Sequence, residues 1–530
     1  MKHCSVIFKP EGRRISIHAG ATVLEAAEQA GIILNTVCGG KGICRKCLVI
    51  IDPDGQEVPA CQHHIQNDLT VTIPPASRFF EQKILAEGLD IQAKIQPDVY
   101  KKYLKISSNG KVFGLAVDIG TTTVVAKLVD MTDGQCLATQ ADLNGQMKYG
   151  DDVISRIHYA ETGEKSAELQ KLIVDGLNNL TEKLCEQVCI EPEDIYEACV
   201  VGNTTMNHIF LKFPVTGLGQ APYKAFNLEA RDHSPQTLGV RMNAAGNIHT
   251  AANIAGFVGA DTTAVALATD VGSIDEQTLI VDIGTNGEIV LGTGDKLYAA
   301  SCAAGPALEG ARITCGSRAM TGAIEAVVVN EGDIDSDVIG GGPANSICGS
   351  ALIDAAAVLL DLGIVNATGR FVGPERLQGR LSPTILSRII EYKGQPAFVL
   401  ADDSSRGGQK VFLTQADIRQ LQLAKAAIRA GIRLLQKKVG IEDSDIKQIF
   451  LAGAFGNYIR RESALRIELL PDVPAERIHF VGNAAGSGAQ MILLSRHWRK
   501  LAEELASRIE YVEIADEPEF QTVFAEEMRF

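Results

Sequence analysis

The chain has 530 residues, of which 46% are hydrophobic and 22% charged, and its formal net charge is −15. This length is too great for one hydrophobic core and predicts several domains. An acidic chain is poorly suited to nonspecific nucleic-acid binding, because phosphate contacts need a basic face. The first residues lack the apolar core of a signal peptide, and no run of about 18 apolar residues follows. We therefore expect no nucleic-acid or membrane partner and a cytoplasmic location.

Residues 1–76 are predicted to form a small domain of their own. Alternating apolar residues predict strands at 3–8, 13–17, 48–52 and 69–73, with a helix at 22–30. This stretch carries seven basic and seven acidic residues, so the remainder of the chain holds the whole negative excess. The change in charge supports a boundary after Pro74 and Pro75. Two strands, a helix, a cysteine-containing loop and two further strands follow the order of a β-grasp ferredoxin.

The loop between the helix and the third strand contains three cysteines, and a fourth follows later. They are Cys38, Cys44, Cys47 and Cys61, with gaps of five, two and thirteen residues. Iron–sulfur clusters need soft thiolate ligands, and the plant-type [2Fe–2S] spacing differs only by a first gap one residue shorter. The neighbouring glycines let the backbone turn tightly and direct N–H groups at sulfur. The pattern predicts a [2Fe–2S] cluster on these four residues.

A zinc site and a disulfide framework are the alternative uses of these cysteines. Zinc sites also contain C-x2-C, but they usually pair two such knuckles, and here the fourth cysteine stands alone. A disulfide framework fits a secreted protein, which the N-terminal sequence does not indicate. Six further cysteines are interpreted mainly as buried packing residues. They are Cys185, Cys189, Cys199, Cys302, Cys315 and Cys348. A second metal site is the lesser alternative for Cys185, Cys189 and Cys199, and a place on the partner surface is the alternative for Cys348.

Residues 77–111 are interpreted as a partly helical linker, and 112–530 alternate apolar strands with amphipathic helices, as in layered α/β proteins. Within this part the segment AVDIGTTTVVAKLVD at 116–130 is echoed by IVDIGTNGEIVLGTG at 280–294. Each is a strand, a tight Asp-Ile-Gly-Thr turn and a second strand. One hairpin used twice predicts a duplicated, two-lobed domain.

Both turns have the residue types that bind phosphate and magnesium. A glycine lets the backbone approach an anion, short polar side chains bond phosphate oxygens, and an aspartate at the end of a strand can hold hydrated Mg²⁺. The predicted site residues are Asp118, Gly120, Thr121, Thr122 and Thr123 in the first copy, and Asp282, Gly284, Thr285 and Asn286 in the second. Glu288 could orient an attacking water or be an ordinary exposed charge. No Walker A sequence is present.

The paired turns resemble the phosphate-1 and phosphate-2 motifs of the superfamily of acetate and sugar kinases, heat-shock ATPases and actin. The segments at 259–269 and 481–494 are similar to its two connecting helices, in which small residues let the lobes pack closely. The segment IFLAGAFGNYI at 449–459 is similar to its adenosine motif. The resemblance implies a two-lobed ribonuclease-H-like ATPase at 112–530. It also implies an adenosine site formed by Gly453, Ala454, Phe455, Gly456 and Asn457.

A ferredoxin domain ahead of such an ATPase resembles the reductive activators of corrinoid proteins, also described as activators of corrinoid-dependent O-demethylases. The motifs CGGKGICRKC, VVGNTTMNHIF, AAGPALEGARI and ICGSALIDAA carry the likeness. It implies an ATP-dependent enzyme that takes an electron from an upstream donor onto its cluster. The electron then passes to inactive Co(II) of a corrinoid protein, and a homodimer is possible. A redox-regulated small-molecule kinase and a non-catalytic electron carrier are the alternatives.

Overall fold

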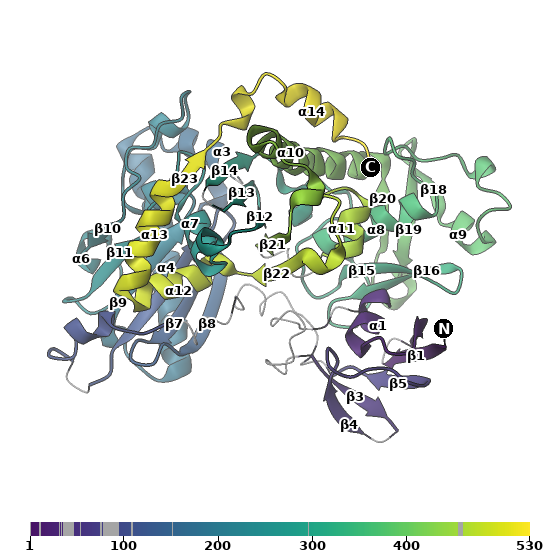
Figure 1. Ribbon diagram of the computed structural model, residues 1–530, viewed down its shortest axis with the longest axis horizontal. Helices are drawn as coiled ribbons and strands as arrows, with labels where there is room; N and C mark the ends of the chain where they lie inside the picture. Colours follow the sequence, from purple (N-terminus) through teal and green to yellow (C-terminus); the bar gives the residue numbers. More distant parts are fainter. Residues whose placement is uncertain are drawn as a thin grey trace.

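The computed structural model describes residues 2–9, 12–30, 32, 34, 47–53, 55–74, 77, 89, 95–107, 110–150, 152–294, 296–453 and 459–530. Figure 1 shows a small N-terminal domain beside two larger lobes, with helices α7, α12 and α13 lying along the first lobe. In the N-terminal domain, β2 contacts β15 of the second lobe. The three parts follow the order expected from the sequence.

The N-terminal domain is a five-stranded sheet with the order β2-β1-β5-β3-β4. Its elements are β1 (His3–Lys9), β2 (Arg13–His18), α1 (Val23–Gln29), β3 (Leu48–Asp52), β4 (Gln56–Pro59) and β5 (Leu69–Thr72). Strand β1 alternates exposed and buried residues, and its buried residues Cys4, Val6 and Phe8 form part of the core with α1. Strand β4 was not predicted, because its four residues carry only one strongly apolar side chain, Val58.

The two lobes contain sheets of the same central design. The first has the order β10-β11-β9-β6-β7-β8 and the second β22-β21-β12-β13-β14-β23. In each, an antiparallel hairpin lies beside a parallel strand: β9 pairs with β6, and β21 pairs with β12. The first sheet is built from β6 (Phe113–Ile119), β7 (Thr123–Asp130), β8 (Cys136–Leu143), β9 (Ile195–Gly202), β10 (Arg231–His233) and β11 (Asn247–Thr250). The second contains β12 (Gln277–Ile283), β13 (Gly287–Thr293), β14 (Leu297–Cys302), β21 (Gln448–Ala452), β22 (Ile478–Gly482) and β23 (Ile509–Tyr511).

Helices cover these sheets, and two smaller sheets extend the second lobe. The helices are α3 (Val153–Tyr159), α4 (Gly163–Val188), α5 (Thr204–Phe210), α6 (Pro235–Leu238), α7 (Ala260–Ala268), α8 (Gly349–Asp361), α9 (Pro383–Ser387), α10 (Gln415–Val439), α11 (Arg461–Arg466), α12 (Ala484–Leu494), α13 (Arg496–Arg508) and α14 (Phe520–Glu526). The added strands are β15 (Ala323–Asn330), β16 (Asp333–Val338), β17 (Ser346–Ile347), β18 (Ile389–Tyr392), β19 (Gln395–Asp402) and β20 (Lys410–Thr414). The duplicated architecture predicted from the repeated hairpin is confirmed.

The two predicted connecting helices, α7 and α12, pack directly on each other. A Cβ atom on Gly488 of α12 would lie 2.1 Å from the carbonyl oxygen of Ala264 in α7. No side chain fits at that separation, so the contact requires glycine. The small residues of both segments therefore serve close helix packing, as the sequence predicted.

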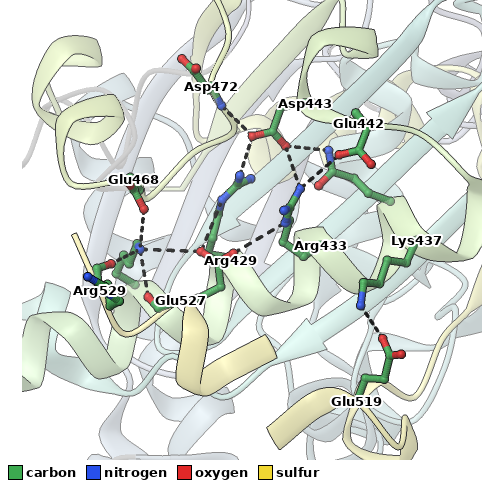
Figure 2. Close-up of polar contacts among 12 residues, drawn as sticks. Arg429, Arg433, Lys437, Glu442, Asp443, Glu468, Asp472, Glu519, Glu527 and Arg529 are labelled. Carbon is green, nitrogen blue, oxygen red and sulfur yellow. Dashed lines mark hydrogen bonds and ion pairs between the residues drawn. The ribbon is translucent and has the colours of Figure 1, made fainter. Parts of the chain in front are cut away.

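Helix α10 packs on β13 and β14 of the second hairpin sheet, and ion pairs link it to residues outside that sheet. Figure 2 shows Arg429 and Arg433 pointing toward Asp443 and Glu527. The fully buried Lys425 donates to the carbonyl oxygens of Glu527 and Arg529 at 2.9 and 2.6 Å. The C-terminal segment thus supplies the partners that let the cations of α10 be buried. This arrangement holds α10 against β13 and β14.

Candidate functional site

The turns of the two repeated hairpins face one cavity between the lobes. Every predicted nucleotide-site residue that the structure describes lines it: Asp118, Gly120, Thr121, Thr122, Thr123, Asp282, Gly284, Thr285, Asn286, Glu288 and Gly453. The other four predicted adenosine-site residues, Ala454, Phe455, Gly456 and Asn457, lie outside the described residues. Segments separated by more than 300 residues therefore meet at one place.

Glycine is required at two positions where the chain turns into the cavity, Gly120 and Gly453, whereas a Cβ atom on Gly284 would make only an ordinary contact, 3.5 Å from Asn286 O. The amide of Gly120 donates to Thr123 O at 3.0 Å, and a Cβ atom there would lie 2.6 Å from the same oxygen. Gly453 has φ of +92°, and its Cβ atom would lie 2.5 Å from Ile283 O. A larger residue would push these segments apart. The backbone of both lobes thus approaches the cavity closely.

Buried polar side chains from three other segments hold the first turn. Asn144 donates to Gly120 O at 2.9 Å, and Asn203 donates to the Thr121 hydroxyl at 2.9 Å. Arg156 of α3 has no exposed surface and donates to Thr121 O at 2.5 Å. None of these three residues was predicted from the sequence. Asn203 lies inside the quoted motif VVGNTTMNHIF, whereas Asn144 and Arg156 carry no motif that could have identified them.

Glu309 joins the two turns. It is the last residue of the short 3-10 helix η8 (Pro306–Glu309). Its carboxylate accepts hydrogen bonds from the hydroxyl of Thr122 at 3.2 Å and of Thr285 at 2.7 Å, and the two hydroxyl oxygens lie 3.3 Å apart. One carboxylate therefore ties the first lobe to the second inside the cavity. Glu309 belongs to the quoted AAGPALEGARI segment, but its role was not predicted.

Four carboxyl groups lie close together in the cavity wall. Asp282 of β12 is directly opposite Glu288 of β13 in the hairpin, and Asp118 and Asp261 come from the first lobe and α7. Burial raises the pKa of Asp282 to about 7, with repulsion from Asp261 adding to the effect. Burial likewise raises the pKa of Asp261 to about 6. The pKa values of Asp118 and Glu288 are raised well above the usual range by burial and by the neighbouring carboxylates.

Such a cluster suits a bound cation, because a positive charge offsets both burial and repulsion. No three His, Cys, Asp or Glu side chains of the described chain converge closely enough to hold a metal ion directly. Hydrated Mg²⁺ keeps several waters and uses one or two carboxylates together with phosphate, so it does not need three converging side chains. Asp261 was missed, although it lies in the segment predicted as the first connecting helix.

Two of the four predicted cluster ligands can be placed. The sulfur atoms of Cys47, which directly precedes β3, and Cys61, which follows β4, lie 3.5 Å apart. Both residues are buried, and Gln62 donates to the Cys61 sulfur at 3.7 Å. Adjacent buried thiols fit as ligands of an iron–sulfur cluster. Cys38 and Cys44 lie outside the described residues.

The other cysteines that were singled out from the sequence have separate places. Cys185, Cys199, Cys302 and Cys348 are buried, Cys315 is half-buried and Cys189 is exposed at the end of α4. Within the described ranges, none joins a group that could hold a metal ion. Cys302 donates to Gly287 O at 3.0 Å beneath the second turn. Cys348 lines the cavity at the start of α8.

Comparison with known proteins covers nearly all of the chain. Residues 3–74 match a family described as a 2Fe-2S iron-sulfur cluster binding domain. Residues 113–273 match the RACo middle region, and residues 276–530 match the C-terminal domain of RACo, the ASKHA domain. No helix in the described part of the chain has the length and apolar character needed to cross a membrane.

Similar proteins carry names that agree with these families. The chain is 34% identical to the corrinoid activation enzyme RamQ of Eubacterium limosum, with 97% of each chain covered. It is 25% identical to a [Co(II) methylated amine-specific corrinoid protein] reductase of Methanosarcina barkeri, over 75% of this chain and 73% of that one. A solved reductive activator for corrinoid, iron-sulfur protein is 32% identical with a TM-score of 0.74, covering 99% of this chain and 98% of the other. The chain therefore belongs to the RACo family of corrinoid activation enzymes, with an N-terminal 2Fe-2S domain and a C-terminal ASKHA ATPase domain.

Proposed function

We propose that this protein reductively activates a corrinoid protein by passing one electron from a [2Fe–2S] cluster to inactive Co(II), in a step that depends on ATP. Family membership supports the reaction class. The observation that carries the ATP dependence is the single cavity in which both phosphate-type turns and the acid cluster meet. We assign the ferredoxin domain to residues 1–76, a linker to 77–111 and the two-lobed ATPase to 112–530.

The roles of the residues follow from their chemistry. Asp118 and Asp282 hold the water shell of Mg²⁺, and Glu288, facing Asp282, orients the attacking water. Thr121, Thr122 and Thr123 of the first turn, and Thr285 and Asn286 of the second, bond phosphate oxygens. Gly453, with Ala454, Phe455, Gly456 and Asn457, forms the adenosine site. The four thiolates of Cys38, Cys44, Cys47 and Cys61 hold the cluster.

The energetics explain why an electron carrier would be joined to an ATPase. When bound, a plant-type [2Fe–2S] cluster supplies an electron near −400 mV, which is not reducing enough for a typical Co(II)/Co(I) couple. For one electron, about 59 mV corresponds to a tenfold change in equilibrium. A gap of a few hundred millivolts is therefore comparable to a 10⁴-fold preference for one bound state. Nucleotide-driven closure of the two lobes could favour the transfer-ready complex by this amount.

The test uses anaerobically purified protein with its cluster prereduced, mixed with a Co(II) corrinoid protein from the same organism. Formation of Co(I) is followed by absorbance with and without Mg-ATP. We expect ATP-dependent Co(I), which both C47A and D282N abolish and which C189S, at an exposed thiol, leaves unchanged. No Co(I) despite a loaded cluster and active ATPase would favour the redox-regulated kinase. Phosphoryl transfer to a small acceptor would establish that alternative.

Three further features complete the proposal. An upstream donor must reload the cluster after each transfer, because the electron that enters the corrinoid leaves the chain. The protein acts in the cytoplasm, and it forms a homodimer, which sedimentation velocity of the full chain would test.

A further inference from the structure

The charged residues that line the cavity are strongly unequal in sign. Five carboxylates contribute to its wall, from Asp118, Asp261, Asp282, Glu288 and Glu309. Among the described lining residues, Arg318 is the one with a positively charged side chain. Nothing in the predicted motifs accounts for it.

Arg318 is held in the cavity by its backbone. It lies on the segment between η8 and β15, where Ser317 donates its amide to Ile347 O at 2.9 Å and its hydroxyl lies 2.6 Å from that of Ser346. Gly310 has φ of +77°, and a Cβ atom there would lie 2.1 Å from Ser317 O. The loop is therefore closed tightly on η8, which fixes the start of the Arg318 side chain.

The guanidinium group crosses to the other lobe, and among the described residues it has no anionic partner. Its Nη2 atom donates to the sulfur of Met147, in the 3-10 helix η4 (Gly145–Tyr149), at 3.4 Å. In the part of the chain that the structure describes, no carboxylate oxygen lies within 4.0 Å of it. A half-buried arginine in a cavity lined by five carboxylates would ordinarily pair with one of them. Its charge is thus available to an anionic ligand.

The sheet order indicates which end of a nucleotide Arg318 would meet. Gly453 follows β21, which lies on one side of β12, whereas β13 and β14 lie on the other. Met147 follows β8, at the β7 side of the first hairpin. If the adenosine lies at Gly453, the phosphate chain runs across both turns toward Arg318. The terminal phosphate is the part of ATP that reaches it.

We propose that Arg318 contacts the γ-phosphate of ATP and stabilises the negative charge that develops during hydrolysis; this rests on the proposed ATPase function. Water attacks Pγ and the bond from Pγ to the β-bridging oxygen breaks. ADP and inorganic phosphate form, and the proton of the water is released to solvent. A planar guanidinium suits this role, because it pairs with two phosphate oxygens at once. Its crossing between lobes would also let the γ-phosphate draw them together.

The test compares R318A and R318K with R312A in the full chain. Arg312 is exposed on the same segment, outside the cavity, and provides the matched control. Three quantities are measured: the kcat of ATP hydrolysis, the Kd of Mg-ADP and the Kd of a non-hydrolysable ATP analogue. We expect R318A to lower kcat about 100-fold and to weaken the analogue about 10-fold, with Mg-ADP binding within twofold of wild type. R318K should recover part of the binding but little of kcat.

The outcomes separate this role from a structural one and from failure of the proposed function. Guanidinium ion added to R318A should restore part of kcat, which a purely structural defect would not permit. Equal weakening of Mg-ADP and the analogue, or an unchanged kcat, would overturn the γ-phosphate contact. A wild-type chain that binds neither nucleotide would instead overturn the ATPase function, and this proposal with it.

Discussion

The two repeated hairpins share a sequence motif but are supported in different ways. Under the first turn lie polar groups, with Arg156 and Asn144 donating to its carbonyl oxygens. Under the second lie Ile428 of α10 and Cys302, whose sulfur lies 3.2 Å from where a Cβ atom on Gly287 would be. The repeat therefore preserves the backbone that faces the cavity and not the means of holding it. One copy depends on buried hydrogen bonds from guanidinium and amide groups, and the other mainly on packing against α10, with one hydrogen bond from the Cys302 thiol to Gly287 O.

The largest expected effect is on the two aspartates that both copies keep. We expect D118N and D282N each to lower the kcat of ATP hydrolysis about 100-fold, since removal of a carboxylate weakens magnesium binding. Steady-state ATPase assays across a magnesium titration measure this. D175N, on the exposed face of α4, is the control. If ATP hydrolysis did not depend on one of the two aspartates, our inference that both turns take part in the chemistry would be wrong.

The supports themselves should respond unequally. R156M removes the donor to Thr121 O, Gly150 O and Gln146 Oε1, so two buried acceptors and one half-buried acceptor lose a partner. We expect a loss of about 3–5 kcal/mol in unfolding free energy and a raised KM for ATP. I428A creates a cavity beneath the second turn and should cost about 2–4 kcal/mol. Thermal unfolding and KM measured together would test this.

If I428A raised KM as much as R156M, the two supports would be equally important for the turns. The proposed contrast would then be wrong, since it requires the directional hydrogen bonds to place the first turn more exactly than packing places the second. A thermal transition unchanged in R156M would also contradict it.

Glu309 links the two turns, and its substitution should give a smaller effect, a gain in nucleotide affinity and not a loss. Glu309 accepts from Thr122 and Thr285, the hydroxyls we assign to phosphate oxygens. In E309Q the negative charge beside the phosphates is lost, so we expect Mg-ADP to bind about 5-fold more tightly by isothermal titration calorimetry. E331Q, at an exposed turn residue of the same lobe, should not change it. Weaker binding in E309Q would show that the carboxylate helps to hold the nucleotide complex.

Much of the fold could be predicted because its signals are local. The repeated Asp-Ile-Gly-Thr turns and the alternating strands of the ferredoxin domain depend on residues close in sequence. Strand β4 escaped prediction because its pairing with β3, and not its composition, makes it a strand. The predicted residues of the nucleotide site were found through motifs, and all of those that the structure describes line the cavity.

The residues that were missed act across long separations. Glu309 and Arg156 function through contacts with turns 187 and 35 residues away. Arg318 is recognisable only from the sign of the charges around it. A single sequence does not display such contacts, because nothing in the local pattern distinguishes these residues from exposed charges. Asp261 and Glu309 lie within motifs that were identified, so the motif located them without giving their role.

The smallest effect concerns pH and follows from the position of Asp282 among the crowded acids of the cavity. A carboxyl whose folded pKa is raised binds its proton more tightly in the folded state, so its burial destabilises the protein at high pH. That cost is relieved as pH falls through the folded pKa, about 7 for Asp282, toward the ordinary value near 4. D282N lacks the charge at every pH. Without nucleotide and with EDTA present, D282N should therefore unfold several degrees above wild type at pH 8.

This gap in Tm should shrink as pH is lowered to 5, where Asp282 is protonated and close in shape to asparagine. Calorimetric scans at pH 5, 6, 7 and 8 measure it, with D175N as the matched exposed control. With saturating Mg-ATP analogue at pH 8, wild type should unfold at a higher temperature than D282N. The bound cation then stabilises the wild-type carboxylate, whereas the variant has no carboxylate at this position. A gap that did not change with pH would mean that the charge of half-buried Asp282 is not destabilised by its surroundings. The acid cluster would then have lost its main reason for binding a cation.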